Sequence, residues 1–349
     1  MALTLQVSTG FYKSRLAGSQ FEIGRELGAR LTGLEVPEAT TAQIRFADRC
    51  RAMLAEVYPP LIERYEGMVE AGAVSERDFR GLYFGRGGPL EVGCTQFAVL
   101  RGRSADGRSL VGRNYDWFYG ALPWREVRTV EPASGFSALT VTHHWAGSPD
   151  AVNEQGLIML LAALPDEEPT GPGLQWHMVI DLVMETCSTV AEAAERIGSV
   201  SHLRGFNYLL ADGDGDALVV EATPDGVGVR EPEEDLLVAT NHLPGQDWDA
   251  TGRGEREVLR HRFSLERYKS AWEGLGSDGT PLNEGAAQSL LRDHTGGICR
   301  GDHAGAPRRG GFHTEFGTLW SLIYRQGEPR LLLAGGHPCI AAYEPYSLD

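Results

Sequence analysis

Apolar residues recur at helical intervals in the first part of the chain and in short, strand-like runs after it. Residues 18–73 follow the helical spacing, which a Tyr-Pro-Pro run at residues 58–60 interrupts. A glycine-rich stretch at residues 85–89 predicts a flexible loop. The change of pattern near residue 90 therefore marks a boundary between a helical part and a strand-rich part.

The strand-rich part predicts strands and helices in a non-alternating order. Strands are expected at residues 95–100, 109–113, 138–143, 156–163, 206–211, 217–222, 236–240, 319–324 and 330–334, and helices at residues 175–186, 189–197, 256–272 and 284–291. Asp106-Gly107 is expected to turn the chain between the first two strands, as in a hairpin. A parallel sheet would alternate strand and helix, so this order favours antiparallel sheets layered with helices.

Composition narrows the classes of protein that the chain can represent. Its 349 residues allow one large domain or two ordinary ones, and an apolar fraction of 42% excludes a largely disordered chain. The formal charge of −16 disfavours nucleic acid or an anionic membrane surface as a partner. The 44 glycines are nearly twice the usual share of ~7%, which favours a turn-rich β fold.

Cysteine usage and hydropathy bear on the location of the protein. The five cysteines are odd in number and widely scattered, which predicts free thiols in a reducing compartment. No apolar run approaches the ~18–20 residues of a membrane span. Residues 1–18 lack the basic start and apolar stretch of a secretory signal, so we expect a cytoplasmic protein.

The tetrapeptide Val92-Gly93-Cys94-Thr95 is the first candidate for chemistry. Its cysteine follows a glycine directly and stands where a strand is expected to begin. A free cysteine in that place is either a small buried residue or a nucleophile, and the tetrapeptide alone does not decide between the two.

The expected hairpin brings two charged residues back toward Cys94. Arg113 and Asp116 end its second strand, within Gly-Arg-Asn-Tyr-Asp-Trp at residues 112–117. A guanidinium beside a thiol favours the thiolate, and a carboxylate there can orient an amine. The alternative is an ion pair on the surface at the hairpin end, which contributes little to stability.

A cysteine at a strand start, followed by a hairpin that ends in Gly-Arg-Asn-x-Asp, resembles the Cys-type N-terminal-nucleophile hydrolases. That superfamily includes choloylglycine hydrolase, penicillin V acylase, acid ceramidase and the acyl-coenzyme A:6-aminopenicillanate acyltransferase family (peptidase family C45). Three further segments resemble family motifs: Asn-Glu-Gln-Gly-Leu at residues 153–157, Ala-Thr-Asn-His at 239–242, and Ser-Leu-Glu-Arg-Tyr at 264–268, which is similar to a helix start. Their order and spacing extend the resemblance over nearly the whole chain.

Two more segments are similar to the acyltransferase branch in particular. Residues 18–24, Gly-Ser-Gln-Phe-Glu-Ile-Gly, resemble the opening of its propeptide. Residues 318–343, which contain Gly-His-Pro-Cys at 336–339, resemble its C-terminal hairpin. The resemblance implies an α+β fold, a four-layer αββα sandwich of two antiparallel sheets. It further implies a helical propeptide at residues 1–93 and a catalytic piece at residues 94–349, both forming one domain.

The resemblance also implies self-cleavage between Gly93 and Cys94. Cleavage would free the α-amino group of Cys94 and leave a heterodimer of the two pieces. In model peptides an α-amino group has a pKa of about 7.7–8.0 and a cysteine thiol about 8.5, so one residue can supply both base and nucleophile. Gly93 suits this step because glycine tolerates unusual backbone angles, although it is also an ordinary loop residue.

The remaining site residues are carried over from the family motifs. Asp116 is expected to hold the α-ammonium group, and Arg113 to polarise the thiolate or contact the acyl oxygen. Asn241 is expected to donate its side-chain N–H to the oxyanion, and the backbone N–H of Ala163 is expected to be the second donor. Arg267 completes the set as a residue at a helix start.

The function implied is acyl transfer through an acyl-enzyme at Cys94. The donor would be a small-molecule amide or acyl thioester, and the acceptor water in an amidohydrolase or an amine in an N-acyltransferase. No cofactor and no metal are expected in this reaction, and nucleic acid and membrane are not expected partners.

Other patterns predict metal or redox chemistry and stay as alternatives. His294, Cys299 and His303 have a spacing that zinc could use, so a non-enzymatic, metal-binding protein on the same scaffold is the alternative from another class. The acidic run at residues 212–216 is similar to half of a calcium loop, but its spacing to Glu221 favours a hairpin turn. The absence of a C-x-x-C motif disfavours a thiol redox protein.

Overall fold

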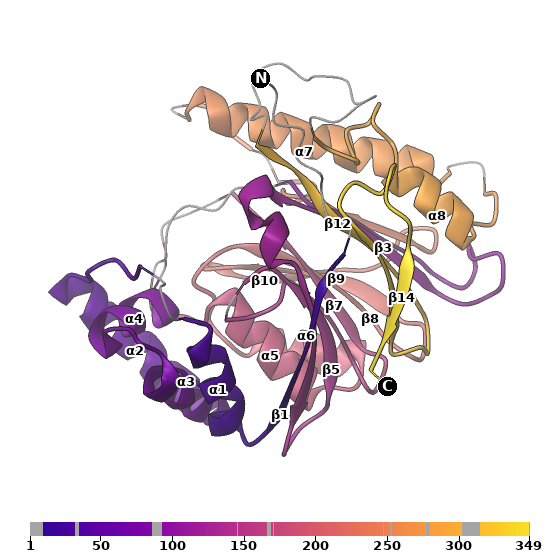
Figure 1. Cartoon of the computed structure of the whole chain (residues 1–349). Coiled ribbons are helices and arrows are strands. Elements are labelled where there is room, and N and C mark those ends of the chain that lie inside the picture. The colour runs from indigo at the N-terminus through magenta and orange to yellow at the C-terminus, as the bar shows by residue number, and fades with distance from the viewer. Residues whose placement is uncertain are drawn as a thin grey trace, which may run out of the picture.

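Two β-sheets face each other, with helices against both outer faces (Figure 1). The computed structural model describes residues 10–31, 35–85, 93–144, 146–165, 169, 171–246, 248–251, 253–276, 279–301 and 315–348. No helix in these ranges is both long enough and apolar enough to cross a membrane.

Among the residues that the structure describes, the larger sheet has eight strands and the smaller has six. The order across the larger sheet is β1 (Tyr12–Gly18), β4 (Glu126–Pro132), β5 (Ala138–Thr142), β6 (Asp150–Asn153), β7 (Ile158–Ala163), β8 (Phe206–Ala211), β9 (Ala217–Thr223) and β10 (Gly226–Arg230). The order across the smaller sheet is β11 (Leu236–Ala239), β2 (Thr95–Val99), β3 (Leu110–Phe118), β12 (Phe316–Arg325), β13 (Arg330–Gly335) and β14 (Glu344–Ser347).

Eight α-helices and one short 3₁₀ helix occupy the described ranges. They are α1 (Gln20–Ala29), α2 (Thr41–Val57), α3 (Pro60–Ala71), α4 (Glu76–Phe84), the 3₁₀ helix η1 (Tyr119–Trp124), α5 (Trp176–Thr186), α6 (Val190–Gly198), α7 (Glu255–Gly274) and α8 (Glu284–Leu291). Helices α5 and α6 cover the larger sheet, and α7 and α8 cover the smaller one (Figure 1).

Three apolar clusters fill the spaces between these four layers. The side chains of β7 show the division, because Ile158, Leu160 and Ala162 point into the cluster between the sheets. Their neighbours Met159 and Leu161 point to the helical side. A strand covered on both faces reads as a continuous apolar run, which is why the sequence of β7 does not alternate. The αββα fold class predicted from the sequence is confirmed.

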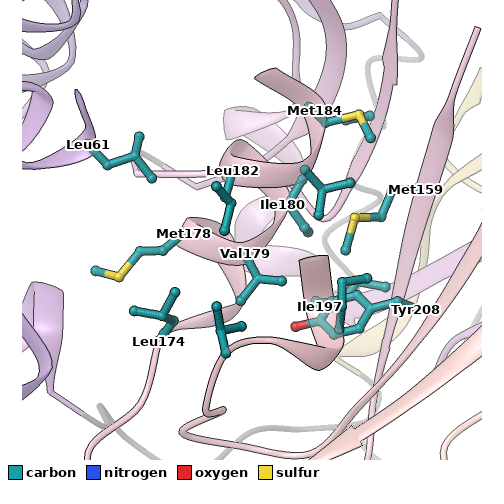
Figure 2. Close-up of a cluster of buried hydrophobic side chains, with 14 of the residues drawn as sticks. Leu61, Met159, Leu174, Met178, Val179, Ile180, Leu182, Met184, Ile197 and Tyr208 are labelled. Carbon is teal, nitrogen blue, oxygen red and sulfur yellow. The ribbon is translucent and has the colours of Figure 1, made fainter. Parts of the chain in front are cut away.

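Helix α5 is apolar almost all round because it is covered on two sides. Figure 2 shows its side chains against β7, β8 and α6 on one side and Leu61 of α3 on the other. The first four helices lie beyond α5, on the side away from the sheets (Figure 1). A helix in such an inner position needs apolar residues on more than one face.

A buried ionic cluster joins the residues before Cys94 to α5. Arg64 of α3 contacts Asp181 at 2.9 Å and Glu185 at 2.5 Å. Glu185 also accepts hydrogen bonds from Gln20 at 2.7 Å and from Tyr58 at 2.8 Å. Burial raises the pKa of Asp181 to about 7, against the opposing effect of Arg64. Removing one partner would leave a buried charge uncompensated. The cluster therefore favours one packing of the residues before Cys94 against α5.

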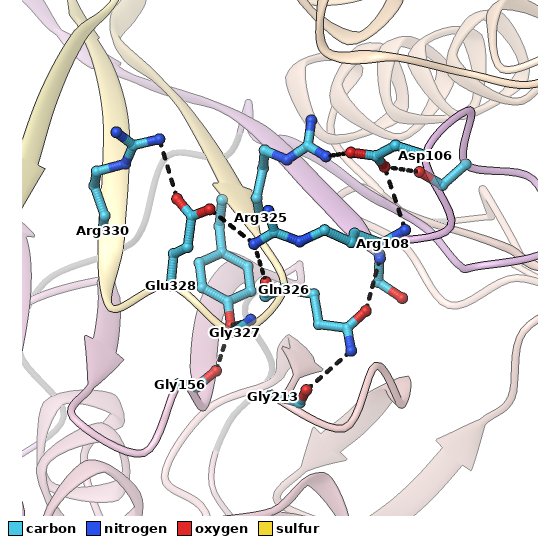
Figure 3. A network of polar contacts seen from close by, with 12 residues as sticks. Asp106, Arg108, Gly156, Gly213, Arg325, Gln326, Gly327, Glu328 and Arg330 are labelled. Atoms are coloured by element: carbon cyan, nitrogen blue, oxygen red, sulfur yellow. Dashed lines mark hydrogen bonds and ion pairs between the residues drawn. The ribbon is translucent and has the colours of Figure 1, made fainter.

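A polar network fastens the two sheets together at the end of the sandwich opposite Cys94 (Figure 3). Tyr324 at the end of β12 donates to the carbonyl of Gly156 at 2.6 Å. Gln326 donates to the carbonyl of Gly213 at 2.9 Å. The turn at residues 212–216 is closed by the Asp212 carboxylate, which accepts three backbone N–H groups of that turn. This agrees with the hairpin expected there.

Several strands were missed by the hydrophobic pattern. β1, β4, β6, β10 and β14 were not predicted, nor was helix α4. β1 and β10 lie at sheet edges and expose most of their side chains, so they carry little apolar signal. Within these antiparallel sheets, one pair at an edge is parallel, since β1 pairs with β4 in parallel. Parallel pairing is possible there because a long crossover separates the two strands.

We expect Gly28→Ala to destabilise the folded chain. A Cβ at this position would lie 2.8 Å from Cα of Met68, where α1 crosses α3. Overpacking of this kind costs about 1–3 kcal/mol and should outweigh the ~1 kcal/mol that alanine contributes as a better helix former. The control is Gly198→Ala in α6, where a Cβ meets nothing within 4 Å. Thermal unfolding should show a lower Tm for Gly28→Ala alone; equal Tm values would contradict the close crossing.

Candidate active site

Cys94 stands directly before β2, beside the second strand of its hairpin. The two strands are antiparallel, with Thr95 opposite Asn114 and Gln96 opposite Arg113. The Cys94 side chain is buried at 6% exposure, at the edge of the cluster between the sheets. The return of the hairpin to Cys94, predicted from the Asp-Gly turn, is therefore observed.

Arg113 places a fixed positive charge against the Cys94 sulfur. Its Nη2 donates to Sγ at 3.3 Å, and its Nη1 contacts the carboxylate of Asp150 at the start of β6. The second oxygen of Asp150 accepts a hydrogen bond from the indole of Trp320 at 2.7 Å. Both charged side chains are fully buried, so Asp150 provides the charge compensation that a buried guanidinium requires.

Asp116 lies against the Gly93–Cys94 peptide. A Cβ built on Gly93 would come within 2.8 Å of the Asp116 Cβ and 2.7 Å of Nη1 of Arg300, so no side chain fits there. Thr318 of β12 donates to one carboxylate oxygen at 2.8 Å. The other oxygen is buried and accepts no hydrogen bond from the described residues, and Arg300 is 3.8 Å from it.

Burial dominates the protonation of Asp116. It raises the pKa of this carboxyl to about 6, although Arg300, Arg267, Thr318 and Arg113 all act to lower it. A second cation placed close to the unbonded oxygen would oppose the effect of burial and favour the carboxylate.

Asn241 follows β11 and is held from three sides. Its backbone N–H donates to Oγ of Ser264 at 2.8 Å, and its Oδ1 accepts from Nη2 of Arg267 at 2.7 Å. Its Nδ2 donates to the carbonyl of Ala163 at 2.7 Å. Arginine can only donate, so its contact fixes the amide with the NH₂ group toward Ala163.

Ser264 and Arg267 contact Asn241 from one face of α7, one turn apart. The helix predicted at residues 256–272 is confirmed, since α7 runs from Glu255 to Gly274, and only the resemblance of residues 264–268 to a helix start is wrong. Arg267 therefore lies in the second half of the helix, but its guanidinium reaches the predicted Asn241.

The backbone of Ala163 points toward the site and away from β8. Leu164 donates its N–H to the carbonyl of Gly205, so Ala163 and Phe206 form the non-hydrogen-bonded pair of the β7–β8 ladder. The Ala163 N–H and C=O are thus directed away from β8, toward the side of β6. No β6 residue lies opposite them there, because β6 begins at Asp150, which pairs with Leu160. One of the two groups, the carbonyl, accepts the Asn241 amide.

A cavity opens beside the Cys94 sulfur and has a mainly aromatic lining. Cys94, Tyr115, Trp117, His144, Pro149, Leu161, Ala163, Trp176 and Phe206 line it. His143 follows β5 and contacts the Tyr115 hydroxyl at 2.9 Å. Burial lowers the pKa of His144 to about 4 and that of His143 well below its usual value, so both rings are neutral at pH 7.

A second group of polar residues lies near Asp116, in the loop that carries Arg300. A ring nitrogen of His294 and the sulfurs of Cys299 and Cys339 all lie within 4.8 Å of one another. His294 and Cys299 were zinc candidates in the sequence, and the third candidate, His303, lies outside the described residues. Cys339 was not expected as their neighbour.

Several site residues carried no local signal in the sequence. These are Asp150, Arg300, Thr318 and Trp320, which lie far along the chain from Cys94. Register places two of them in the β3–β12 pair: Thr318 lies opposite Asp116, and Trp320 lies opposite Tyr115. A pattern of residues along the chain does not contain this pairing, because β12 follows β3 by about 200 residues.

Asp116→Asn should change the pH dependence of stability. Because the pKa of Asp116 is raised, the folded state holds its proton more tightly than the unfolded chain, and this contribution is lost as pH rises from about 4 past 6. In a Cys94→Ala background, which has no thiol there to cleave the chain, we expect Asp116→Asn to be more stable than its parent at pH 8, by up to ~3 kcal/mol, and equal to it near pH 4. Urea unfolding at several pH values measures the difference.

The exposed Asp214→Asn is the matched control for that experiment, since it makes the same chemical change far from the site. A stability difference for Asp116→Asn that stays constant from pH 4 to pH 8 would show that its carboxyl is not the buried acid described above.

Comparisons with known proteins place these residues in a family. The family model described as "Acyl-coenzyme A:6-aminopenicillanic acid acyl-transferase" matches residues 103–338, about two thirds of the chain. The match includes Arg113, Asp116, Asn241 and Arg267, and it begins after Cys94. None of the curated proteins matches the sequence significantly.

Several solved structures are similar to this chain at a distance. Penicillin V acylase from Agrobacterium tumefaciens is 15% identical with a TM-score of 0.47, covering 69% of this chain and 83% of its own. A variant of conjugated bile acid hydrolase from Clostridium perfringens is 13% identical with a TM-score of 0.49, covering 73% and 97%. The Caenorhabditis elegans ortholog of N-acylethanolamine-hydrolyzing acid amidase is 15% identical with a TM-score of 0.45, covering 68% and 94%.

Scores this low support no functional statement about the present chain. The family match is different in kind, because it extends over about two thirds of the chain and over both charged residues of the β2–β3 hairpin. The chain belongs to the acyl-coenzyme A:6-aminopenicillanic acid acyl-transferase family.

Proposed function

We propose that this enzyme cleaves itself before Cys94 and then transfers acyl groups through a thioester on that residue. Membership of an acyl-transferase family supplies the reaction class. The single observation that carries the finer proposal is the contact of Cys94 Sγ with a buried guanidinium at 3.3 Å, next to a glycine that has no room for a side chain.

Self-cleavage begins with attack of the Cys94 thiolate on the carbonyl carbon of Gly93. The C–N bond between the two residues breaks, a thioester forms, and the released α-amine takes up a proton. Water then hydrolyses the thioester and frees the thiol. Arg113 favours the thiolate that attacks, because its guanidinium is fixed beside the sulfur.

The new α-ammonium group has a partner in Asp116. That carboxylate already lies against the Gly93–Cys94 peptide, and its buried second oxygen accepts no hydrogen bond from the described residues. An ammonium group there would satisfy the oxygen and lower the pKa of Asp116 below its value of about 6 in the uncleaved chain. Asp116 thus orients the base that removes the thiol proton in each turnover.

The oxyanion formed from the substrate would accept hydrogen bonds from Ala163 and Asn241. The Ala163 N–H points to the side of β7 where the cavity lies. Asn241 uses one hydrogen of its NH₂ group on the Ala163 carbonyl, and the second hydrogen is the donor we assign to the oxyanion. Ser264 and Arg267 are positioning residues, because they hold the amide and do not contact the reacting atoms.

The cavity beside Cys94 indicates the chemistry of the acyl group. Its lining is mostly aromatic and aliphatic, and the ring of His144 in this lining is neutral at pH 7. Its volume is about 40 Å³, room for a few water molecules, so the side chains that line it must move apart before an acyl group can enter. We propose an apolar acyl group, carried by a small-molecule amide or thioester and passed to water or an amine.

The mature enzyme would be a heterodimer of the pieces 1–93 and 94–349, in one αββα domain. The ionic cluster around Arg64 and the pairing of β1 with β4 join the two pieces without the cleaved bond. The proposal places the enzyme in the cytoplasm, where a reducing environment keeps a catalytic thiol active. The alternative of a non-enzymatic scaffold protein is set aside because the family is one of acyl transferases.

Cys94→Ala should abolish both cleavage and turnover, because the same sulfur attacks in both reactions. Intact-mass spectrometry of the purified wild type should show two species that divide between Gly93 and Cys94, and the variant should show one uncleaved chain. Cys187→Ser is the control, since that buried cysteine lies outside the site. A single uncleaved wild-type chain with full activity would sink the self-processing proposal.

Asn241→Asp should reduce kcat by about 10²–10³-fold, because it keeps the shape of the side chain but removes the proposed donor. A panel of N-acyl p-nitroanilides of increasing acyl length measures the effect on the processed enzyme. Ser264→Ala keeps the amide donor of Asn241 and removes only the hydroxyl that accepts its backbone N–H, so it should reduce kcat less. An unchanged kcat for Asn241→Asp would exclude it as an oxyanion donor.

A further inference from the structure

The cluster of His294, Cys299 and Cys339 lies outside the proposed acyl-transfer machinery. His294 and Cys299 belong to the loop that follows α8, and Cys339 to the loop that follows β13. Cys299 is buried, whereas His294 and Cys339 are half-buried, so the cluster is reachable from solvent. Two thiols and an imidazole at one place are the ligand set of a soft divalent metal.

The distance between the two sulfurs fits a shared metal ion. Sγ of Cys299 and Sγ of Cys339 are 3.7 Å apart. Two thiolates bound to tetrahedral zinc at ~2.3 Å each are about 3.8 Å apart, whereas the sulfurs of a disulfide are about 2.05 Å apart. The pair therefore needs almost no movement to bind zinc.

A hydrogen bond selects the tautomer of the His294 ring that can bind a metal. Its Nδ1 lies 3.2 Å from the carbonyl of Cys299, and a carbonyl only accepts. The ring proton is thus on Nδ1, which gives Nε2 the lone pair. Metal-binding histidines commonly donate their other ring nitrogen to a backbone carbonyl in this way.

Other contacts hold the two loops in place before any metal binds. Arg292 donates to the carbonyl of Pro338 at 2.9 Å and so ties the first loop to the second. Within the first loop, the Cys299 N–H donates to the carbonyl of Asp293 at 2.8 Å. Asn114 of β3 donates to the carbonyl of Ile298 at 2.9 Å. A site whose supporting hydrogen bonds are already formed loses less conformational entropy when it binds a metal ion.

We propose that His294, Cys299 and Cys339 form a zinc site with one imidazole and two thiolate ligands. Binding releases the two thiol protons, so the two thiolates neutralise the charge of Zn²⁺ in this partly buried place. Three protein ligands leave the fourth tetrahedral position to water. This inference does not depend on the acyl-transfer proposal.

The site would connect to Asp116 through one residue. Arg300 follows Cys299 directly, and its carbonyl accepts the Thr318 N–H at 2.9 Å while its guanidinium faces the Asp116 carboxylate at 3.8 Å. Zinc would fix the loop that carries Arg300, and so the charge beside Asp116. We assign the metal a structural role of this kind, not one in bond breaking.

The test is zinc content and cobalt spectroscopy of the full chain. Protein purified under reducing conditions should contain one zinc per chain by elemental mass spectrometry, and zinc should survive dialysis. After replacement by Co²⁺, thiolate-to-cobalt charge-transfer absorption and tetrahedral d–d bands should appear. Cys339→Ser should weaken zinc binding by more than ~100-fold, since loss of a mere supporting contact already costs about 10–100-fold.

Cys187→Ser is the matched control and should keep both the zinc and the cobalt spectrum. His294→Gln should weaken binding and leave the charge-transfer band of the thiolates at high cobalt concentration. The proposal is overturned if reduced protein binds no zinc, if Cys339→Ser retains it, or if peptide mapping of protein prepared without oxidant finds Cys299 joined to Cys339 as a disulfide.

Discussion

The site depends on a buried guanidinium that is held against a sulfur. Arg113 lies with its Nη2 3.3 Å from Cys94 Sγ, and its charge is compensated by Asp150, which is itself fixed by Trp320. A buried cation without a partner would cost several kcal/mol, so the chain needs the carboxylate from the opposite sheet to keep this arrangement. The facing of the two sheets is thus a requirement of the chemistry as well as of the core.

A second constraint is the lack of space around Gly93. The residue is in contact with Asp116 and Arg300, so the peptide before Cys94 lies directly on the carboxylate that would later bind the new amine. Under the proposed self-cleavage, close packing of this kind would prepare the site in advance. The loop that supplies Arg300 also supplies Cys299, which is how the cluster of two thiols and an imidazole comes to lie near the site.

Local patterns predicted much of the fold and part of the site. The hairpin that joins Cys94 to Arg113 was predicted because a turn signal and two short strands lie within about 25 residues. The strands at the sheet edges were missed, since residues such as those of β1 and β10 face solvent and have no apolar periodicity. Arg267 was assigned to a helix start by the family resemblance, whereas the apolar pattern already extended that helix back to residue 256, in agreement with α7.

The sequence by itself determined the layered α+β class, the hairpin, and the residues of the family motifs, because each of these depends on neighbours along the chain. Only the tertiary structure decided which distant groups complete the site: Asp150 and Trp320 behind Arg113, Thr318 against Asp116, and Cys339 beside Cys299. Such contacts are fixed by strand register and by the packing of one sheet on another. Burial, which changes the protonation of Asp116, likewise exists only once the layers have closed.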